Sequence, residues 1–289
     1  MSDPTAPNLV IVRSVRELRE AVAGWRRVGE TVGLVPTMGA LHTAHMALVD
    51  EARKHADRVV ATIFVNPTQF GPDEDFSSYP RREARDIETL RTHGVDLLFA
   101  PGVEDMYPAG FETNVNVPDI SQGLCGDHRP GHFAGVATIV TKLLLQALPD
   151  CAVFGEKDYQ QLQVIRRLAL DLDIPVAIIG LPTVREADGL AVSSRNANLS
   201  PADRATAPKM HVALKGVAAR LLAGETAAVA CAAGHEALAA AGFSPIEYLE
   251  VRAADTLLPA SQAPAGTPLR ALAAAWLGET RLIDNLPVA

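Results

Sequence analysis

Two histidines three residues apart, His42 and His45, stand where they could bind an anionic ligand. The short apolar run before them predicts a buried strand over residues 32–35, followed by a loop that contains glycine. Apolar residues then recur at helical spacing and predict a helix over residues 42–53. The first turn of a helix offers free backbone N–H groups and the positive end of the helix dipole, which both favour a bound anion. The arrangement therefore predicts a phosphate site.

Spacing alone leaves the role of the two histidines open. Histidines near a helix start are often surface or capping residues without a ligand. A zinc pair is a second alternative, but the two residues between them do not include the glutamate of the zincin pattern, and the sequence offers no obvious third ligand. We therefore expect no resident metal at this position.

Polar side chains follow two further predicted strands, at the points where those strands end. Asn66 and Gln69 come directly after a strand predicted over residues 58–65. A strand predicted over residues 151–154 is followed by a second polar group, made of Gly155, Lys157, Asp158 and Gln161. Each group alone could be an ordinary polar loop. Because ligands bind beyond the carboxyl ends of parallel strands, the succession predicts one shared polar ligand site.

Lys157 has the charge to bind a phosphate oxygen, and Asp158 can hydrogen-bond a ribose. The surrounding residues are not a P-loop, because the pattern GxxxxGK[ST] is absent. Ser193, Ser194 and Arg195 add two hydroxyls and a guanidinium, which can surround phosphates through charge-assisted hydrogen bonds. The alternative for this segment is a solvated turn.

Arg129 and His132 form another basic pair, whose alternative reading is an ordinary surface loop. Asp127, Glu156 and Asp188 are the candidate metal ligands, but their spacing specifies no metal cage. We expect magnesium to arrive bound to phosphates instead.

The elements that must position these residues alternate between apolar strands and amphipathic helices. The predicted strands are residues 9–12, 32–35, 58–65, 96–100, 151–154 and 176–179. The predicted helices are residues 14–27, 42–53, 81–92, 136–147 and 159–170, and residues 66–80 are polar and rich in turns. Strands that are apolar nearly throughout indicate a parallel sheet covered on both faces. The pattern predicts an α/β fold, a Rossmann-like doubly wound parallel sheet domain over residues 1–184.

The pattern changes after the loop-rich residues 181–200. An alanine-rich stretch over residues 202–241 predicts two helices broken near Gly224, and residues 246–251 and 282–285 predict strands. Residues 269–277 are ambiguous, because propensity favours a helix while the short span also allows a strand. We predict a smaller, lid-like α+β domain over residues 185–289.

The composition bounds the class of protein. The chain has 289 residues, of which 48% are hydrophobic and 21% charged, and these are globular values. A net charge of -8 argues against a nucleic-acid surface, and three widely spaced cysteines argue against disulfides. We find no signal-peptide pattern at the N-terminus and no uncharged apolar run of membrane-spanning length. We therefore expect a soluble, cytoplasmic protein that binds neither nucleic acid nor membrane.

Several stretches together resemble one family, the pantothenate synthetases or pantoate–β-alanine ligases, within the HxGH nucleotidyltransferase superfamily. The matching stretches are VPTMGALHTAH, IFVNPTQF, YPR, RPGHFAGV, FGEKDYQQL, PTVREADGLAVSSRN and TRLIDN. They occur in the family's order across nearly the whole chain, from about residue 9 to residue 286. Any one of them is moderate support, whereas the full set is very specific.

The resemblance implies an ATP-dependent ligation with MgATP, pantoate and β-alanine as small-molecule substrates, and a homodimer. Pantoate would first form pantoyl adenylate and pyrophosphate, and β-alanine would then displace AMP to give pantothenate. The resemblance assigns catalytic roles to His42, His45, Lys157, Ser193, Ser194 and Arg195. It assigns ATP binding to Pro36, Met38, His45, Gly155, Lys157, Asp158, Val184, Ser193, Ser194 and Arg195. It assigns pantoate binding to Met38, Phe64, Asn66, Gln69 and Gln161, with Pro36 as a further residue of the pocket wall. It places Arg129 and His132 at the entrance for β-alanine.

One position departs from the family motif, since Ala44 stands where the family has glycine between the histidines. The added methyl group is expected to crowd ATP and weaken its binding while the reaction is kept. An acyl adenylate hydrolyses easily, so we also expect residues 186–196 to act as a closing lid.

Three other functions are weighed against the ligase. Another HxGH transferase would not need the Gln69 and Gln161 pair around a small hydroxy acid. A nucleotide-binding protein that has lost catalysis would be expected to lose its charged residues first, and the chain keeps them. A fragment of a tRNA synthetase is disfavoured by the acidic charge and by the missing anticodon domain.

Overall fold

The computed structural model describes residues 9–72, 76 and 79–288. Contacts between residues divide the chain into two compact units. The N-terminal unit comprises the chain up to Pro118 together with Arg129–Glu156 and Val164–Pro182. The C-terminal unit comprises Asp119–His128, Lys157–Gln163 and the chain from Thr183 onward. The predicted boundary after residue 184 lies close to Thr183, but two shorter segments from earlier in the sequence also belong to the C-terminal unit.

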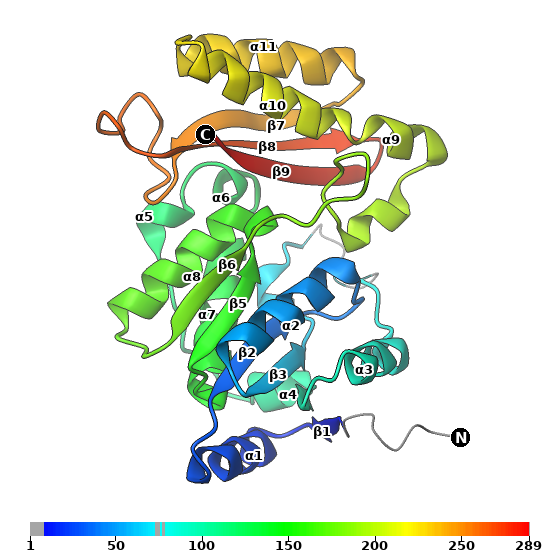
Figure 1. The fold of residues 1–289 in the computed structure, drawn as a ribbon, viewed down its shortest axis with the longest axis vertical. Helices are drawn as coiled ribbons and strands as arrows, with labels where there is room; N and C mark the ends of the chain where they lie inside the picture. The colour runs from blue at the N-terminus through cyan, green and yellow to red at the C-terminus, as the bar shows by residue number, and fades with distance from the viewer. Residues whose placement is uncertain (1–8, 73–75, 77–78, 289) are drawn as a thin grey trace. The chain divides into compact units, whose positions relative to one another are not determined.

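The N-terminal unit is built on a six-stranded parallel sheet with the strand order β1-β4-β3-β2-β5-β6 (Figure 1). The strands are β1 (Val10–Val12), β2 (Val32–Thr37), β3 (Arg58–Ile63), β4 (Leu97–Phe99), β5 (Cys151–Gly155) and β6 (Ala177–Leu181). The chain moves from β2 toward β3 but from β5 toward β6, in opposite directions along the sheet. The order therefore reverses between β2 and β5, and the predicted doubly wound α/β sheet is confirmed.

Helices cover this sheet on both faces. The helices of this unit are α1 (Val15–Arg27), α2 (Thr43–His55), α3 (Glu83–Thr92), α4 (Val103–Met106), α7 (His132–Ala147) and the later part of α8 (Tyr159–Asp171). Because crossovers between parallel strands are right-handed, α1 and α2, which join strands in opposite directions along the sheet, lie on opposite faces. Helix α2 packs on β2, β3 and β5, whereas α1 packs against α7.

Local sequence explains why these elements begin where they do. Ser14 caps α1, since its hydroxyl accepts from the Glu17 N–H at 3.3 Å and the Glu17 carboxylate accepts from the Ser14 N–H at 3.0 Å. Helix α3 begins at Glu83, two residues after its predicted start. Helix α7 begins at His132, four residues before its predicted start. The inner strands of the sheet are largely apolar because they are enclosed, and Leu97, Leu98 and Phe99 of β4 are fully buried.

The C-terminal unit contains a three-stranded antiparallel sheet in the order β7-β8-β9 (Figure 1). Its strands are β7 (Ile246–Ala253), β8 (Leu269–Leu277) and β9 (Thr280–Val288), and its helices are α5 (Pro118–Ser121), α6 (Cys125–His128), α9 (Pro201–Thr206), α10 (Lys209–Leu222) and α11 (Ala227–Ala240). The break near Gly224 is confirmed, but the prediction of two helices over residues 202–241 is wrong because α9 and α10 are separate. Pro208 precedes α10, and proline cannot continue a helix from the preceding turn.

The ambiguous residues 269–277 form β8, the central strand of this sheet. Most of β8 is buried between its two neighbours and α10. Alanines in the middle of the strand, such as Ala273 and Ala275, bury a small side chain in the core that α10 and α11 complete. Tertiary packing therefore overrides the helix propensity of the alanine run.

A half-buried ion pair links β7 and β9 of the C-terminal unit. The Glu247 carboxylate accepts from Arg281 Nη2 at 2.6 Å and from Trp276 Nε1 at 2.7 Å. Arg281 Nη2 also lies 3.5 Å from Cys125 Sγ, and that thiol lies 3.0 Å from the Tyr248 hydroxyl. These contacts attach the Asp119–His128 segment to the small sheet.

Replacing Glu247 with glutamine is expected to lower the free energy of unfolding by about 2 kcal/mol at neutral pH, because the half-buried Arg281 loses its counter-charge. Burial alone would raise the pKa of Glu247, but the hydrogen bonds from Arg281 and Trp276 hold that pKa below its usual value. A glutamate whose pKa is lowered on folding stabilises the folded state at pH values above about 4.3, its pKa in the unfolded chain. This stabilisation is lost as the pH falls through the pKa of the folded protein. Thermal unfolding from pH 7 to pH 3 measures the effect: the gap between wild type and Glu247→Gln should shrink with acid, while exposed Glu236→Gln changes little. A gap independent of pH would contradict the assignment.

Three further observations complete the fold. All three cysteines are free, as predicted. No helix in the described part of the chain is long and apolar enough to cross a membrane. Part of the predicted polar segment, residues 73–75 and 77–78, lies outside the described residues.

Candidate active site

The predicted histidine pair lies at the start of α2, directly after the loop that follows β2. The helix begins at Thr43, so His42 is the residue that precedes it and His45 is in its first turn. The two imidazole rings stack with their centroids 4.0 Å apart, and the His42 N–H donates to His45 Nδ1 at 3.3 Å. The rings therefore lie beside the helix N-terminus, where backbone N–H groups favour an anion.

A buried carboxylate shapes the loop that leads to these histidines. Asp86 of α3 is 2% exposed, and its two oxygens accept from the N–H groups of Ala40 and Leu41, each at 2.9 Å. Ala40 has a φ of 51° and Gly39 a φ of 84°, so the loop takes a left-handed turn that needs support. The Asp86 carboxylate thus fixes the backbone immediately before His42. Sequence reasoning did not single out Asp86, because it belongs to a helix distant in sequence.

Replacing Asp86 with asparagine is expected to raise the KM for ATP about tenfold, because an amide N–H would face one of the two loop N–H groups and leave it buried and unsatisfied. The measurement is steady-state kinetics with ATP varied, alongside Asp50→Asn on the exposed face of α2 as the matched control. If both variants match wild type, Asp86 does not shape the loop.

A buried polar cluster follows β3, and it brings together four of the predicted site residues. Asn66 Nδ2 donates to Gln69 Oε1 at 2.9 Å, and Gln69 Nε2 lies 3.2 Å from Met38 Sδ. His132 Nδ1 lies 2.8 Å from the Gln69 backbone oxygen. Asn66 is only 1% exposed, so these amides are oriented by protein partners rather than by water. The cluster can present fixed hydrogen-bonding groups to a small polar ligand.

Tyr107 completes this cluster and was not predicted. Its hydroxyl donates to Asn66 Oδ1 at 2.7 Å, and its ring lies 6.1 Å from that of Phe64, a predicted wall residue. Burial raises the pKa of Tyr107, so its hydroxyl stays protonated and remains a donor at neutral pH. No predicted strand or helix covers Tyr107, and its proximity to Asn66 is a tertiary contact across 41 residues.

The pair Arg129 and His132 also lies in the N-terminal unit. Arg129 Nη1 lies 3.0 Å from His132 Nε2, and the guanidinium can only donate. The backbone oxygen opposite His132 Nδ1 can only accept, so the contacts assign a neutral imidazole with its proton on Nδ1. Arg129 is thereby held by the same histidine that contacts the Gln69 backbone.

Gly135 of α7 allows the helix to approach the Asn66–Gln69 turn closely. A side-chain carbon at this position would lie 2.3 Å from the Thr68 carbonyl oxygen and 2.7 Å from Gln69 Cα. Asn66 Nδ2 also donates to the Gly135 carbonyl at 3.2 Å. Only glycine permits this contact between the helix and the polar cluster.

The remaining predicted residues include the turn after β5, which is the short 3-10 helix η2 (Glu156–Asp158). Lys157 Nζ lies 3.8 Å from Asp158 Oδ2, and Gln161 follows in the first turn of α8. Gly155, the last residue of β5, has open space where a side chain would be. That space would let a ligand approach the backbone at the end of the strand.

The serine-rich segment forms a second short 3-10 helix, η3 (Ser194–Asn198). Ser193 caps it, because its hydroxyl accepts from the Arg195 N–H at 3.3 Å. Upstream, the Val192 N–H donates to the Val184 carbonyl at 2.9 Å, so the two ends of the intervening loop meet.

The predicted residues thus fall into two sets. The N-terminal unit holds Pro36, Met38, His42, His45, Phe64, Asn66, Gln69, Arg129, His132 and Gly155. The C-terminal unit holds Lys157, Asp158, Gln161, Val184, Ser193, Ser194 and Arg195. Contacts within the first set join Met38, Asn66, Gln69 and His132, whereas the binding and catalytic roles of all these residues stay predictions.

Comparison with known proteins gives the affiliation of the chain. The sequence profile of the family described as pantoate-beta-alanine ligase matches residues 10–287. The chain belongs to the pantoate-beta-alanine ligase family. The resemblance expected from the motifs is confirmed, and with it the class of the protein, an enzyme of the ligase type.

Individual relatives agree with this affiliation. The pantothenate synthetase of Paramagnetospirillum magneticum is 60% identical over 278 residues, which cover 96% of this chain and 97% of that protein. The crystal structure of pantothenate synthetase from Thermus thermophilus aligns with a TM-score of 0.90 at 50% identity, covering 97% of this chain and 99% of that one. The ligase from Francisella tularensis, complexed with beta-gamma ATP and beta-alanine, aligns with a TM-score of 0.81 at 33% identity, covering 97% of this chain and 98% of that one. These relatives remove the alternative of a tRNA synthetase fragment and that of a transferase acting on a phosphate acceptor.

Proposed function

We propose that this enzyme condenses pantoate with β-alanine to form pantothenate, using ATP and passing through a pantoyl adenylate. The observation that carries the proposal is the family match over residues 10–287, which includes every motif that holds a predicted site residue. The Francisella relative is described as a complex with an ATP compound and β-alanine, and those ligands support the same substrates here. The buried Asn66–Gln69 cluster is consistent with a small hydroxy acid as the third substrate.

In the first step, a carboxylate oxygen of pantoate attacks the α-phosphorus of ATP, and the bond to the bridging oxygen of pyrophosphate breaks. Negative charge builds up on the phosphoryl oxygens and on the leaving pyrophosphate. Such a reaction asks the protein mainly for positioning and for charge stabilisation, so cations and N–H donors suffice. We assign these roles to His42 and His45 at the α2 N-terminus, and to Lys157, Ser194 and Arg195.

Pantoate is proposed to bind against the polar cluster after β3. Gln69 Nε2 is a donor that can bind the hydroxyl or carboxylate oxygens of pantoate, and Asn66 holds the Gln69 carbonyl in place. Met38 and Phe64 supply apolar contact for the dimethyl part of the substrate. We further assign Gln161 of the C-terminal unit to pantoate and Asp158 to the ribose.

In the second step, the uncharged amine of β-alanine attacks the acyl carbon of the adenylate. The amide bond forms, the bond from the acyl carbon to the AMP oxygen breaks, and the amine loses a proton to solvent or to AMP. Arg129 carries a positive charge that is suited to the β-alanine carboxylate. Closure of residues 186–196 would exclude water and protect the adenylate from hydrolysis.

Magnesium is proposed to arrive with the nucleotide. In the part of the chain that the structure describes, no three His, Cys, Asp or Glu side chains gather as a metal site. Phosphate oxygens are the proposed ligands, as is usual for magnesium with ATP. We also propose a cytoplasmic homodimer, and light scattering on the purified enzyme tests whether its mass is twice that of one chain.

Replacing Ala44 with glycine, the residue of the family motif, is expected to lower the KM for ATP about threefold to tenfold, because one methyl group would no longer crowd the nucleotide. Ala44 is half-buried in the first turn of α2, between the two histidines. The measurement compares the ATP KM of the two proteins at saturating pantoate and β-alanine. Equal values would show that the methyl group does not hinder ATP.

The proposed reaction is tested by pyrophosphate release from MgATP with purified enzyme. Release should require pantoate, and AMP together with an amide product should appear only after β-alanine is added. If the enzyme binds ATP but releases no pyrophosphate with pantoate, the alternative of a nucleotide-binding protein without catalysis would replace the proposal.

A further inference from the structure

We propose that Asp284 and Asn285, adjacent residues of β9, are positioning residues that hold the Lys157 turn and the Arg185–Asn196 loop in place for adenylation. This inference rests on the proposed function, since it concerns how two groups of predicted catalytic residues are oriented. Both residues belong to the terminal TRLIDN motif, to which the sequence assigned no role. We refer to the two residues as the β9 anchor.

Asn285 fastens the backbone of the catalytic lysine. Its Nδ2 donates to the Lys157 carbonyl at 2.9 Å, and its Oδ1 accepts from Arg270 Nε at 2.6 Å. Arg270 in turn lies over the ring of Tyr159, with 3.7 Å from its Cζ to the ring centroid. The turn that carries Lys157 is therefore held at its carbonyl and again two residues later, by side chains that are themselves buried.

Asp284 fastens the loop that leads to the catalytic serines. Its two oxygens accept from Arg185 Nη1 and Nη2 at 2.8 and 2.9 Å, a bidentate pair of the strong kind. The same Arg185 donates to the Gly189 carbonyl at 3.0 Å, so the ion pair also holds the loop at Gly189. Asn196, at the far end of the loop, donates to the Ala191 carbonyl at 3.0 Å.

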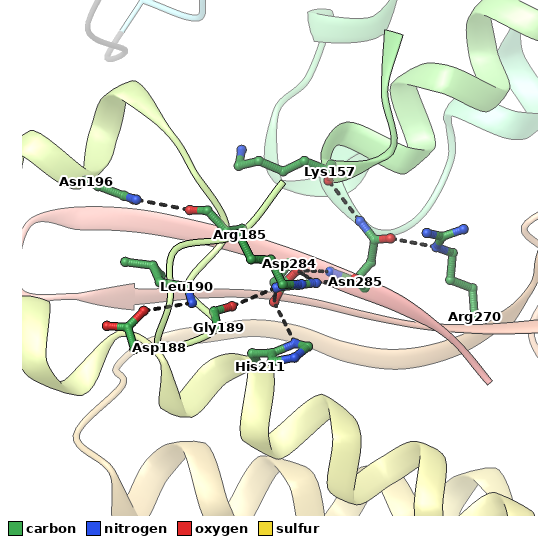
Figure 2. A network of polar contacts seen from close by, with 11 residues as sticks. Lys157, Arg185, Asp188, Gly189, Leu190, Asn196, His211, Arg270, Asp284 and Asn285 are labelled. Carbon is green, nitrogen blue, oxygen red and sulfur yellow. Dashed lines mark hydrogen bonds and ion pairs between the residues drawn. The ribbon is translucent and has the colours of Figure 1, made fainter. Parts of the chain in front are cut away.

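Figure 2 shows how the two contacts diverge from neighbouring positions, with Asn285 between Lys157 and Arg270 and Asp284 between Arg185 and His211. Successive side chains of a strand point to opposite faces, so two adjacent residues can reach two separate segments. The Asn285 N–H also donates to Asp284 Oδ1 at 2.7 Å, and Arg185 Nη2 donates to the Asn285 carbonyl at 3.2 Å. A shift of the Lys157 turn would therefore also displace the Arg185–Asn196 loop, and the reverse.

The charge of Asp284 is stabilised inside the unit. Burial alone would raise the pKa of Asp284, but His211 and Arg185 hold it below its usual value. Of these two, Arg185 is the stronger partner, because His211 Nδ1 lies 3.6 Å from Asp284 Oδ2, beyond normal hydrogen-bond length. A carboxylate that stays charged at neutral pH can hold the Arg185 fork.

The test uses the full-length enzyme with Asn285→Ala and Asp284→Asn, and with exposed Asn116→Ala and Asp255→Asn as matched controls. Asn285→Ala is expected to lower kcat for pyrophosphate release by about tenfold to a hundredfold, the loss typical of a catalytic group displaced by about 1 Å. The KM for β-alanine should stay unchanged, because Lys157 is assigned to the adenylation step and not to the binding of β-alanine. If Asn285→Ala does not fold, Asn285→Asp replaces it, since aspartate keeps the acceptor for Arg270 but replaces the donor to the Lys157 carbonyl with an oxygen that cannot donate.

A double-mutant cycle separates positioning from general stability. If Asn285 acts through Lys157, the double variant Lys157→Ala/Asn285→Ala should be no slower than Lys157→Ala alone. Two losses that multiply, or an Asn285→Ala rate within twofold of wild type, would overturn the proposal.

Amide hydrogen exchange supplies a readout that does not depend on turnover. Asp284→Asn should speed exchange at Glu186–Val192, and Asn285→Ala should speed it at residues 157–159, while the controls leave both segments as in wild type. Unchanged exchange in both variants would also overturn the proposal. A wild-type enzyme that releases no pyrophosphate would instead refute the proposed function, and the exchange result would still decide whether the anchor holds the two segments.

Discussion

Replacing Lys157 with alanine is expected to lower kcat/KM for pyrophosphate release by about 100- to 1,000-fold, the range found when one donor that stabilises transition-state charge is removed. Lys157 follows β5 directly, where the order of the parallel strands reverses and where ligands bind in such sheets. Its ammonium group would stabilise the charge that develops on the phosphoryl oxygens during adenylation. The loss should fall mainly on kcat, because that charge is larger in the transition state than in bound ATP.

The matched control is Lys215→Ala, which removes an exposed lysine from α10. Both variants are compared by the initial rate of pantoate-dependent pyrophosphate release, with circular dichroism as a check of folding. A folded Lys157→Ala enzyme that keeps more than half of its activity would remove the lysine from the mechanism.

Replacing Gly135 with alanine is expected to destabilise the fold by about 3 kcal/mol or more and to raise the KM for pantoate about tenfold or more. The new methyl carbon would lie 2.3 Å from the Thr68 carbonyl oxygen and 2.5 Å from its carbon, and both are backbone atoms that a rotamer change cannot move. Either α7 or the Asn66–Gln69 turn must therefore shift. Since Asn66 bridges the two through the Gly135 carbonyl, the shift would disturb the proposed pantoate site.

Gly216 in α10 provides the control for Gly135. A side-chain carbon at Gly216 meets no atom within 4 Å, and its backbone is ordinary helix, so Gly216→Ala should stabilise the protein by up to about 1 kcal/mol. Thermal unfolding and the pantoate KM are measured for both variants. A Gly135→Ala enzyme with wild-type stability and wild-type KM would contradict the close approach of α7.

The parallel sheet could be predicted from the sequence because its inner strands β2, β3, β4 and β5 are enclosed and largely apolar, while the more exposed edge strands β1 and β6 are apolar as well. The run 58–65 predicted β3, although the strand ends at Ile63. Strand β8 could not be assigned from its residues, because alanine favours a helix and only the enclosing strands and helices make it extended. The short helices α4, α5 and α6 carry too few residues for a periodic signal.

The sequence predicts those residues of the candidate site that directly follow the end of a strand. His45, Asn66 and Lys157 could each be picked out by their place after a predicted strand. Asp86 and Tyr107 could not, because each reaches the site from a distant element and no local pattern marks the contact. The β9 anchor belongs to the same class, since Asn285 meets Lys157 across 128 residues.

The central claim is that the carboxylate of pantoate becomes bonded to the α-phosphorus of ATP. Pantoate carrying ¹⁸O in both carboxylate oxygens tests it directly, because the adenylate route moves one of these oxygens into AMP. We expect mass spectrometry to find one ¹⁸O in AMP and one in the new amide carbonyl of pantothenate. Unlabelled AMP, or ADP and phosphate in its place, would contradict a pantoyl adenylate.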